Sequence, residues 1–162
     1  MDAEGRALAP AAGTVVNALA TGIGSAFAID ADVTATVSLS PGEGVAGEVA
    51  GAPDADTRLV EACVERVVDR FADEPLGGTV KTESEVPMAS GLKSSSAAAN
   101  ATVLATLDAL DAVEAVSRED AARIGVAAAR EVGVTVTGAF DDASASMLGG
   151  LTITNNEQDA LL

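Results

Sequence analysis

The run from Pro87 to Ala99 constrains this chain more than any other feature of the sequence. It reads Pro-Met-Ala-Ser-Gly-Leu-Lys-Ser-Ser-Ser-Ala-Ala-Ala. The alternating residues from Thr79 to Val86 predict a strand before it, and the Ala-rich segment from about Ser95 to Val113 predicts a long helix buried on most sides. The fold must therefore present a polar loop, rich in serine, at the start of a buried helix.

This loop has the composition of an anion-binding site. Backbone N–H groups and the helix dipole attract negative charge at a helix N-terminus, Lys93 adds a point charge, and serine hydroxyls bond phosphate oxygens or Mg²⁺. The pattern is not that of a P-loop, because Gly91 is the only glycine in it and Lys93 follows a leucine. A capped Ala-rich helix behind a polar loop with no ligand fits the composition equally well, so the residue types alone leave both interpretations open.

The first half of the chain predicts strands followed by a helix. Alternation from Ile23 to Leu39 predicts paired strands, and the Gly-rich segment from Pro41 to Asp56 predicts a hairpin or loop. Apolar residues recur every three or four positions from Leu59 to Phe71, which predicts an amphipathic helix packed on a sheet. Cys63 lies on that apolar stripe, so we expect it in the core and not as a nucleophile.

The second half of the chain predicts shorter elements. Ser117-Arg118-Glu119-Asp120 forms a capping box that opens a third helix ending near Gly133. The pattern then predicts an extended segment from Val134 to Phe140 and a short helix or turn from Asp141 to Met147. A strand from Leu151 to Thr154 follows. Because strands come first and helices later, with one strand between them, the predicted fold class is α+β.

Composition excludes several kinds of chemistry. Of the 162 residues, 48% are apolar, which is enough to bury a core. The absence of histidine excludes a zinc site and a Ser-His-Asp triad, and a single cysteine excludes an internal disulfide.

Charge and hydropathy restrict the partners. The 25 Asp and Glu residues against 9 Lys and Arg give a formal charge of −16 without a concentrated basic patch, so we expect neither nucleic acid nor a membrane as partner. No apolar stretch approaches the roughly 20 residues that cross a bilayer. The acidic start is unlike a signal peptide, and we therefore expect a soluble cytoplasmic protein. Many acids with few lysines resemble the composition of proteins from salt-loving (halophilic) organisms, in which salt screens self-repulsion.

Three segments together resemble one family. The loop follows the pattern Pro, three residues, Gly-Leu, one residue, Ser-Ser, and this pattern is similar to the nucleotide-binding motif of the GHMP kinases. The form Gly-Leu-Lys-Ser-Ser-Ser-Ala resembles the archaeal shikimate kinase branch of that superfamily. That branch's amino-terminal motif is similar to residues Ala9–Asn17 followed by Thr21–Asp30. The segment that carries its catalytic aspartate resembles Gly138–Asp142 followed by Leu148–Gly150.

The resemblance implies a fold and a domain organisation. It implies the amino-terminal, ATP-binding domain of a GHMP kinase over residues 1–162, similar to domain 2 of ribosomal protein S5, with a left-handed β-α-β crossover. The family's carboxy-terminal domain and its Gly-rich third motif are absent from these residues. We therefore interpret the chain as the amino-terminal part of a longer kinase.

The same resemblance implies site residues. Asp142, which precedes Gly149-Gly150 by the family's interval, corresponds to the catalytic aspartate, and Ser95 and Glu131 correspond to the residues that bind Mg²⁺. The ATP-binding residues that it implies are Pro87, Met88, Ala89, Ser90, Gly91, Leu92, Lys93, Ser94, Ser95, Ser96 and Ala97.

Several assignments have alternatives. A solvated charge at a helix end is the alternative for Glu131, and a turn cap is the alternative for Asp141. Asn17 and Asp141 are weak candidates for substrate binding. The cation that would hold the substrate carboxylate stays open, with the candidates Arg6, Arg123, Arg130 or a residue beyond Leu162.

The activity that the resemblance implies is ATP-dependent phosphorylation of the shikimate 3-hydroxyl in aromatic amino-acid biosynthesis, with ATP and Mg²⁺ as cofactors. The alternatives are another acceptor alcohol, of the homoserine or mevalonate type, and a non-catalytic relative that senses nucleotide or sugar. One departure matters here, because Ala11-Ala12-Gly13 lacks the lysine that mevalonate kinase carries in its first motif. We infer from the residues that Lys93 supplies part of that charge.

Overall fold

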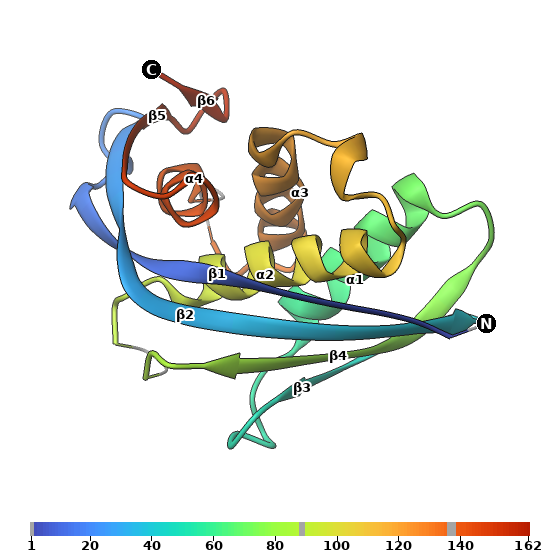
Figure 1. Cartoon of the computed structure of the whole chain (residues 1–162). Coiled ribbons are helices and arrows are strands. Elements are labelled where there is room, and N and C mark those ends of the chain that lie inside the picture. Colours follow the sequence, from blue (N-terminus) through green and yellow to red (C-terminus); the bar gives the residue numbers. More distant parts are fainter. Residues whose placement is uncertain (1, 88–89, 136–138) are drawn as a thin grey trace.

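One curved sheet carries all of the described helices on its inner side (Figure 1). The computed structural model describes residues 2–87, 90–135 and 139–162. The sheet has six strands in the order β3-β4-β2-β5-β6, and β1 pairs with β2. Within the described residues, no helix has both the length and the apolar character needed to cross a membrane. The arrangement confirms the predicted α+β class.

The long strand β2 organises the sheet. β2 spans Ile23–Pro41, and β1 (Ala3–Val16) runs antiparallel along one of its edges. β4 (Leu76–Ser84) and β5 (Leu151–Asn155) share the other edge, also antiparallel. The prediction of paired strands from Ile23 to Leu39 is therefore wrong, since this segment is one strand. No glycine or proline interrupts residues 25–40, so nothing there turns the chain.

A parallel pair of strands flanks α1. β3 (Val45–Val49) pairs in parallel with β4, and α1 (Arg58–Phe71) connects the two strands. Parallel neighbours need such a crossover, because a tight turn joins only antiparallel strands. β3 falls in the segment predicted as a hairpin or loop. The glycines in and around this short strand interrupt the alternating pattern that would indicate it. α1 confirms the predicted amphipathic helix, and the left hand of the crossover stays a prediction.

Three further helices cover the inner face together with α1 (Figure 1). Their bounds are Ser94–Ala109 for α2, Arg118–Glu131 for α3 and Phe140–Leu148 for α4, with a 3₁₀ turn η1 at Val113–Ala115 and a short final strand β6 at Ala160–Leu161. α3 begins where the capping box predicts, because the Ser117 hydroxyl accepts a hydrogen bond from the Asp120 N–H at 3.1 Å.

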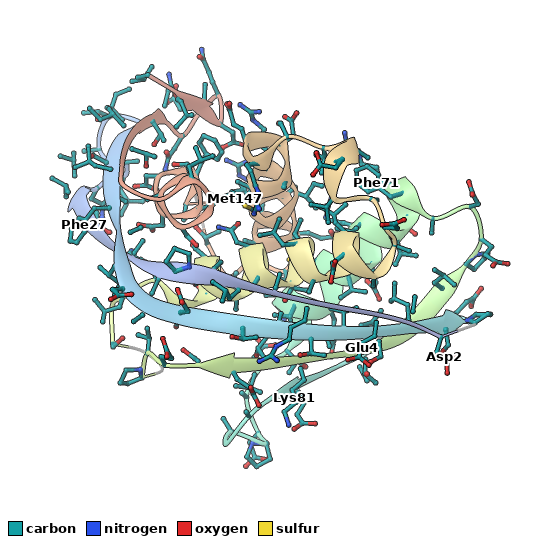
Figure 2. All side chains as sticks on the ribbon, in the orientation of Figure 1. Asp2, Glu4, Phe27, Phe71, Lys81 and Met147 are labelled. Carbon is teal, nitrogen blue, oxygen red and sulfur yellow. The ribbon has the colours of Figure 1, made fainter. Side chains whose placement is uncertain are left out.

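Close packing between α2 and the sheet depends on Gly5 in β1. A Cβ at Gly5 would overlap the backbone of Ala105 and Ala109 in α2. The core then fills the space between the helices and the sheet, and Met147 points between α4 and α3 (Figure 2). Cys63 is fully buried there, and burial raises the pKa of its thiol to about 12, so the thiol stays protonated. This confirms its placement in the core.

The outer face of the sheet exposes an apolar cluster. Phe27, Leu151 and Ile153 have exposed fractions of 40%, 60% and 47% and occupy neighbouring positions of β2 and β5. Figure 2 shows Phe27 on the side of the sheet away from the helices. Its ring lies against Gly13 of β1, where a Cβ would contact the ring at 2.5 Å. We call these three residues the outer apolar cluster.

Candidate functional site

The predicted phosphate loop lies at the N-terminus of α2. Of its residues, Met88 and Ala89 fall outside the described residues, and Pro87, Ser90, Gly91 and Leu92 are exposed. Lys93 occupies the N-cap position with φ 54°, in the left-handed region, and no side chain caps the helix. A non-glycine residue in that region costs roughly 1 kcal/mol, which points to a functional constraint at Lys93.

Two features orient this loop toward a ligand. The Ala12 N–H of β1 donates to the Leu92 carbonyl oxygen at 3.2 Å, which fixes the loop to the sheet. The N–H groups of the first turn, at Ser94 and Ser95, precede any partner within the helix and are available to an anion. Ala97, the last residue of the predicted set, is fully buried and packs in the core.

Asp142 joins this loop through Lys93. The Asp142 side chain lies in the first turn of α4 and is only 4% exposed. Lys93 Nζ lies 3.3 Å from Asp142 Oδ2, and Thr14 Oγ1 of β1 donates to Asp142 Oδ1 at 3.2 Å. Three segments distant in the sequence therefore bring an amine, a hydroxyl and a carboxylate to one point. The role of Lys93 in activating a substrate hydroxyl stays a prediction.

Electrostatics make Asp142 more basic than an ordinary aspartate. Burial raises the pKa of the Asp142 carboxyl, and the negative charge of Asp141 raises it further. The charge and hydrogen bond of Lys93 and the hydrogen bond from Thr14 act in the opposite direction, and the net shift is upward. A carboxylate with a raised pKa beside a lysine is suited to accept a proton from an alcohol.

Asp141 faces a different part of the protein. Its side chain is 5% exposed, and its Oδ1 accepts a hydrogen bond from Asn156 Nδ2 at 2.9 Å. Thr154 Oγ1 in turn donates to Asn156 Oδ1 at 2.6 Å. Gly24 of β2 makes room for this carboxylate, because a Cβ at Gly24 would overlap it. The carboxylate therefore bonds to Asn156, and Asp141 supports the site through its charge.

The structure does not bring the other predicted residues to this point. Glu131, at the end of α3, is 58% exposed and pairs with Arg66 of α1, whose Nη2 lies 2.6 Å from its Oε2. No contact among the described residues links Glu131 to Ser95. Asn17 is exposed, and its Oδ1 accepts the Leu19 N–H at 2.7 Å, so it caps a local turn. The substrate and metal roles of these residues stay predictions.

The candidate cations for a substrate carboxylate differ in their present partners. Arg123 pairs with Glu119 and Asp120 on its own helix. Arg130 pairs with Asp159, its Nη1 lying 2.6 Å from Oδ2. An arginine already bound by carboxylates is a poor receptor for another, so neither is favoured for that role as placed.

An apolar groove continues from the N-terminus of α2. It has a volume of about 180 Å³ and runs between the sheet, α1 and α2. Val49, Leu59 and Val60 line it, together with Ser94 and Ser95 of the first turn of α2. A flat apolar ring with an attached phosphate chain matches this combination, since the ring would occupy the groove and the phosphates would reach the helix N-terminus.

A divalent metal fits this site only in part. Mg²⁺ takes oxygen ligands, keeps several waters and commonly needs only one or two protein groups beside substrate phosphates. The described part of the chain holds no group of three or more acidic, histidine or cysteine side chains suited to a metal. The exposed Ser95 hydroxyl fits a metal carried by phosphates, whereas Glu131 as placed is held by Arg66.

Comparison with known proteins identifies the family. The family described as GHMP kinases N terminal domain matches residues 58–150, which include the phosphate loop, α3 and α4. The chain belongs to the GHMP kinase family. A shikimate kinase of Halobacterium salinarum is 69% identical over 160 residues, which cover 98% of this chain and 56% of that protein. This GHMP kinase chain therefore spans about half the length of the curated relative it matches.

Solved structures agree on the GHMP kinase fold. Homoserine kinase from Cytophaga hutchinsonii superposes with a TM-score of 0.80 at 20% identity, covering 98% of this chain and 51% of that one. A complex described as MDDEF with MVAPP, AMPPCP and magnesium superposes with a TM-score of 0.72 at 21% identity, covering 96% and 48%. At these identities the likeness shows the fold, and it confirms a GHMP kinase amino-terminal domain.

Sequence reasoning missed several polar residues around the GHMP kinase site. Thr14 lies within the amino-terminal motif, and its position three residues before Asn17 was the only signal for it. Asn156, which bonds Asp141, directly follows β5, and Thr154 of β5 bonds Asn156; neither residue carries a local pattern. Asn100 lies in the Ala-rich helix α2 and is buried. The only sign of it in the sequence is one amide side chain among small apolar residues.

Proposed function

We propose that this chain forms the nucleotide-binding and proton-accepting part of a shikimate kinase, which converts ATP and shikimate to ADP and shikimate 3-phosphate. The observation that carries the proposal is the pairing of Lys93, at the phosphate loop, with the buried Asp142. The 69% identity to the Halobacterium salinarum shikimate kinase supports shikimate as the acceptor. The expected cytoplasmic location belongs to this proposal, because ATP and a biosynthetic intermediate are its substrates.

The nucleotide would bind along α2. The apolar groove beside Leu59 and Val60 would take the base, and the N–H groups and hydroxyls at Ser94 to Ser96 would bond the phosphates. Lys93 would lie where the transferred phosphoryl group meets the acceptor, because its amine reaches Asp142 from the loop. Phosphoryl transfer needs little from a protein beyond this positioning and charge stabilisation.

Asp142 would accept the proton of the shikimate 3-hydroxyl. Its raised pKa, caused by burial and by Asp141, favours proton transfer toward it as the oxygen attacks phosphorus. The hydrogen bond from Thr14 holds the carboxylate in one orientation, and the charge of Lys93 favours its ionised form. The proton would therefore move to an Asp142 carboxylate oxygen.

Magnesium would enter with the nucleotide. Ser95 would bind it through its hydroxyl, and Glu131 would do so only after leaving Arg66. When bound, the ion would supply positive charge that neutralises the phosphate oxygens.

The test is an assay of ADP release with shikimate, homoserine and mevalonate as acceptors. The chain would be assayed alone and fused to the part of the Halobacterium salinarum relative that it does not match. We expect turnover with shikimate in the fusion and little in the chain alone. Turnover with homoserine or mevalonate instead would favour those acceptors, and nucleotide binding without turnover by any acceptor would favour the sensor alternative.

A further inference from the structure

Asn100 is a buried polar residue of α2 whose bonding is incomplete. Its side chain is 0% exposed, and its Nδ2 donates to the Ala143 carbonyl oxygen at 2.9 Å. Its Oδ1 has no hydrogen-bond partner among the described residues. Buried polar atoms in folded proteins are almost always hydrogen-bonded to protein or to an ordered water. We therefore expect Asn100 Oδ1 to accept a hydrogen bond.

A small cavity adjoins Asn100. It has a volume of about 30 Å³ and is lined by α2, α3, the start of α4, Leu59 of α1 and the segment at Val134 and Thr135. Gly125 of α3 keeps it open, because a Cβ there would lie 3.7 Å from Asn100 Oδ1 and 3.3 Å from the Ala99 Cβ. Ser95 and Ser96 also line the cavity. A space of this size with several polar groups holds a water, whereas a purely apolar cavity stays dry.

The cavity lies between the two parts of the candidate site. α2 carries the phosphate loop at its start, and Ala143, which accepts the Asn100 amide, directly follows Asp142 in α4. Because Ser95 and Ser96 of the first turn of α2 line the same cavity, a water on Asn100 Oδ1 would lie beside that turn. Asn100 is therefore placed to link the position of Asp142 to that of the phosphate loop.

We propose that this cavity binds one ordered water on Asn100 Oδ1, and that Asn100 is a positioning residue that fixes Asp142 relative to the phosphate loop. The positioning role rests on the proposed function, and the water site does not. The ligand is a single water because the space is small and Asn100 Oδ1, the one unpartnered buried atom among the described residues that line it, is a hydrogen-bond acceptor.

Gly125→Ala tests the water site without any assay of activity. Alanine in place of a glycine inside a helix ordinarily raises the melting temperature, and Gly125 lies in α3 outside the left-handed region. Here the new methyl would take the place of the water and leave Asn100 Oδ1 without a donor, so we expect a lower melting temperature. In an Asn100→Leu background the same change should not lower it. A rise in the parent background would overturn the water site.

Asn100→Leu tests the positioning role in the fused enzyme. We expect kcat to fall about tenfold or more with little change in the KM for ATP, because displacement of Asp142 affects the chemical step. Thr102→Val is the matched control, since Thr102 Oγ1 is an equally buried and unpartnered atom of α2 that does not line the cavity. Equal kcat values for the two variants would overturn the role.

The two tests also separate this inference from the proposed function. If the parent fusion transfers no phosphoryl group to shikimate, the proposed function fails and the positioning role fails with it. The sign of the melting-temperature change in Gly125→Ala still decides the water site in that case.

Discussion

Asp142 is held between opposing influences that suit a base. Burial and the charge of Asp141 raise its pKa, and Lys93 with Thr14 limit that rise. A carboxyl with a raised pKa in the folded protein contributes stability at low pH, and this contribution is lost as the pH rises through the folded pKa. Ionisation of the buried Asp142 carboxyl therefore comes at some expense of stability.

Asp142→Asn tests this role. The amide keeps the shape but removes the charge and the basic oxygen, so we expect kcat in the fused enzyme to fall by about 100-fold or more. The affinity for ATP should change only a few-fold. The variant should also be at least as stable as the parent above the folded pKa, because it avoids burying an ionised group.

The control for this prediction is Asp141→Asn, measured in the same assay. Asp141 acts on Asp142 through charge, so its loss should shift the acid limb of the pH–rate profile to lower pH. Loss of turnover in Asp141→Asn with full turnover in Asp142→Asn would move the proton acceptor by one residue.

Lys93→Met separates phosphate binding from folding. Methionine keeps an unbranched side chain and leaves the left-handed N-cap conformation as strained as before. We expect kcat/KM for ATP to fall by about 100-fold, the usual scale for losing a positioned charge in the transition state. The variant should also be less stable than the parent, because the buried Asp142 carboxylate loses its cation, so the kinetics are compared at a temperature at which both proteins stay folded.

Lys81→Met provides the comparison for Lys93. Lys81 is the other lysine of the chain and pairs with Glu48 on the surface of β4, 3.4 Å away. It should lose neither turnover nor stability to a measurable extent. Equal kinetics for the two variants would remove Lys93 from the mechanism.

At the residue scale, sequence reasoning reached Lys93 and Asp142 but missed their supports. A charged loop at a helix start follows from local composition, and the resemblance supplied Asp142. Thr14 and Asn156 depend on strands that meet α4 only after folding. For Glu131, the resemblance implied a metal-binding role, but spacing along the chain gives no sign that Arg66 of another helix pairs with it.

Among elements, contact between α2 and β1 decides where the phosphate loop lies. Helices with clear periodicity, such as α1 and α3, were predictable from sequence, because their apolar stripes and caps are local signals. The sequence pattern does not predict β1 as a strand, and it predicts a hairpin or loop where β3 lies. Small residues and glycines in both strands weaken the alternation that marks a half-buried strand.

Gly5→Ala tests the contact between α2 and β1. The added methyl would overlap the backbone of Ala105 and Ala109, so the helix must move away from the sheet. We expect a loss of about 1–3 kcal/mol in the free energy of unfolding, as for other overpacked cores, measured by urea titration.

Glu4→Ala is the matched control on the opposite face of the same strand. Glu4 is exposed, so its replacement should change stability by about 0.5 kcal/mol or less. If the two variants were equally stable, α2 would have freedom to shift, and the packing at Gly5 would not position the phosphate loop.

The whole molecule combines a net charge of −16 with the outer apolar cluster. The 9 Lys and Arg residues offset only part of the 25 acidic charges, and Arg66, Arg123 and Arg130 do so in ion pairs. Uncompensated negative charge repels itself and destabilises the folded chain at low ionic strength. The Debye length falls from about 10 Å at 0.1 M salt to about 3 Å at 1 M, so salt removes most of this repulsion.

The melting temperature should therefore rise as KCl increases from about 0.1 M to 1 M, the range over which screening becomes short. A variant with Glu43→Gln, Asp54→Asn and Glu74→Gln removes three exposed negative charges, which changes −16 to −13. It should melt higher than the parent at low salt and gain less from added KCl, because less repulsion remains to be screened. An equal salt response in both proteins would mean that KCl acts by strengthening apolar burial instead of by screening charge.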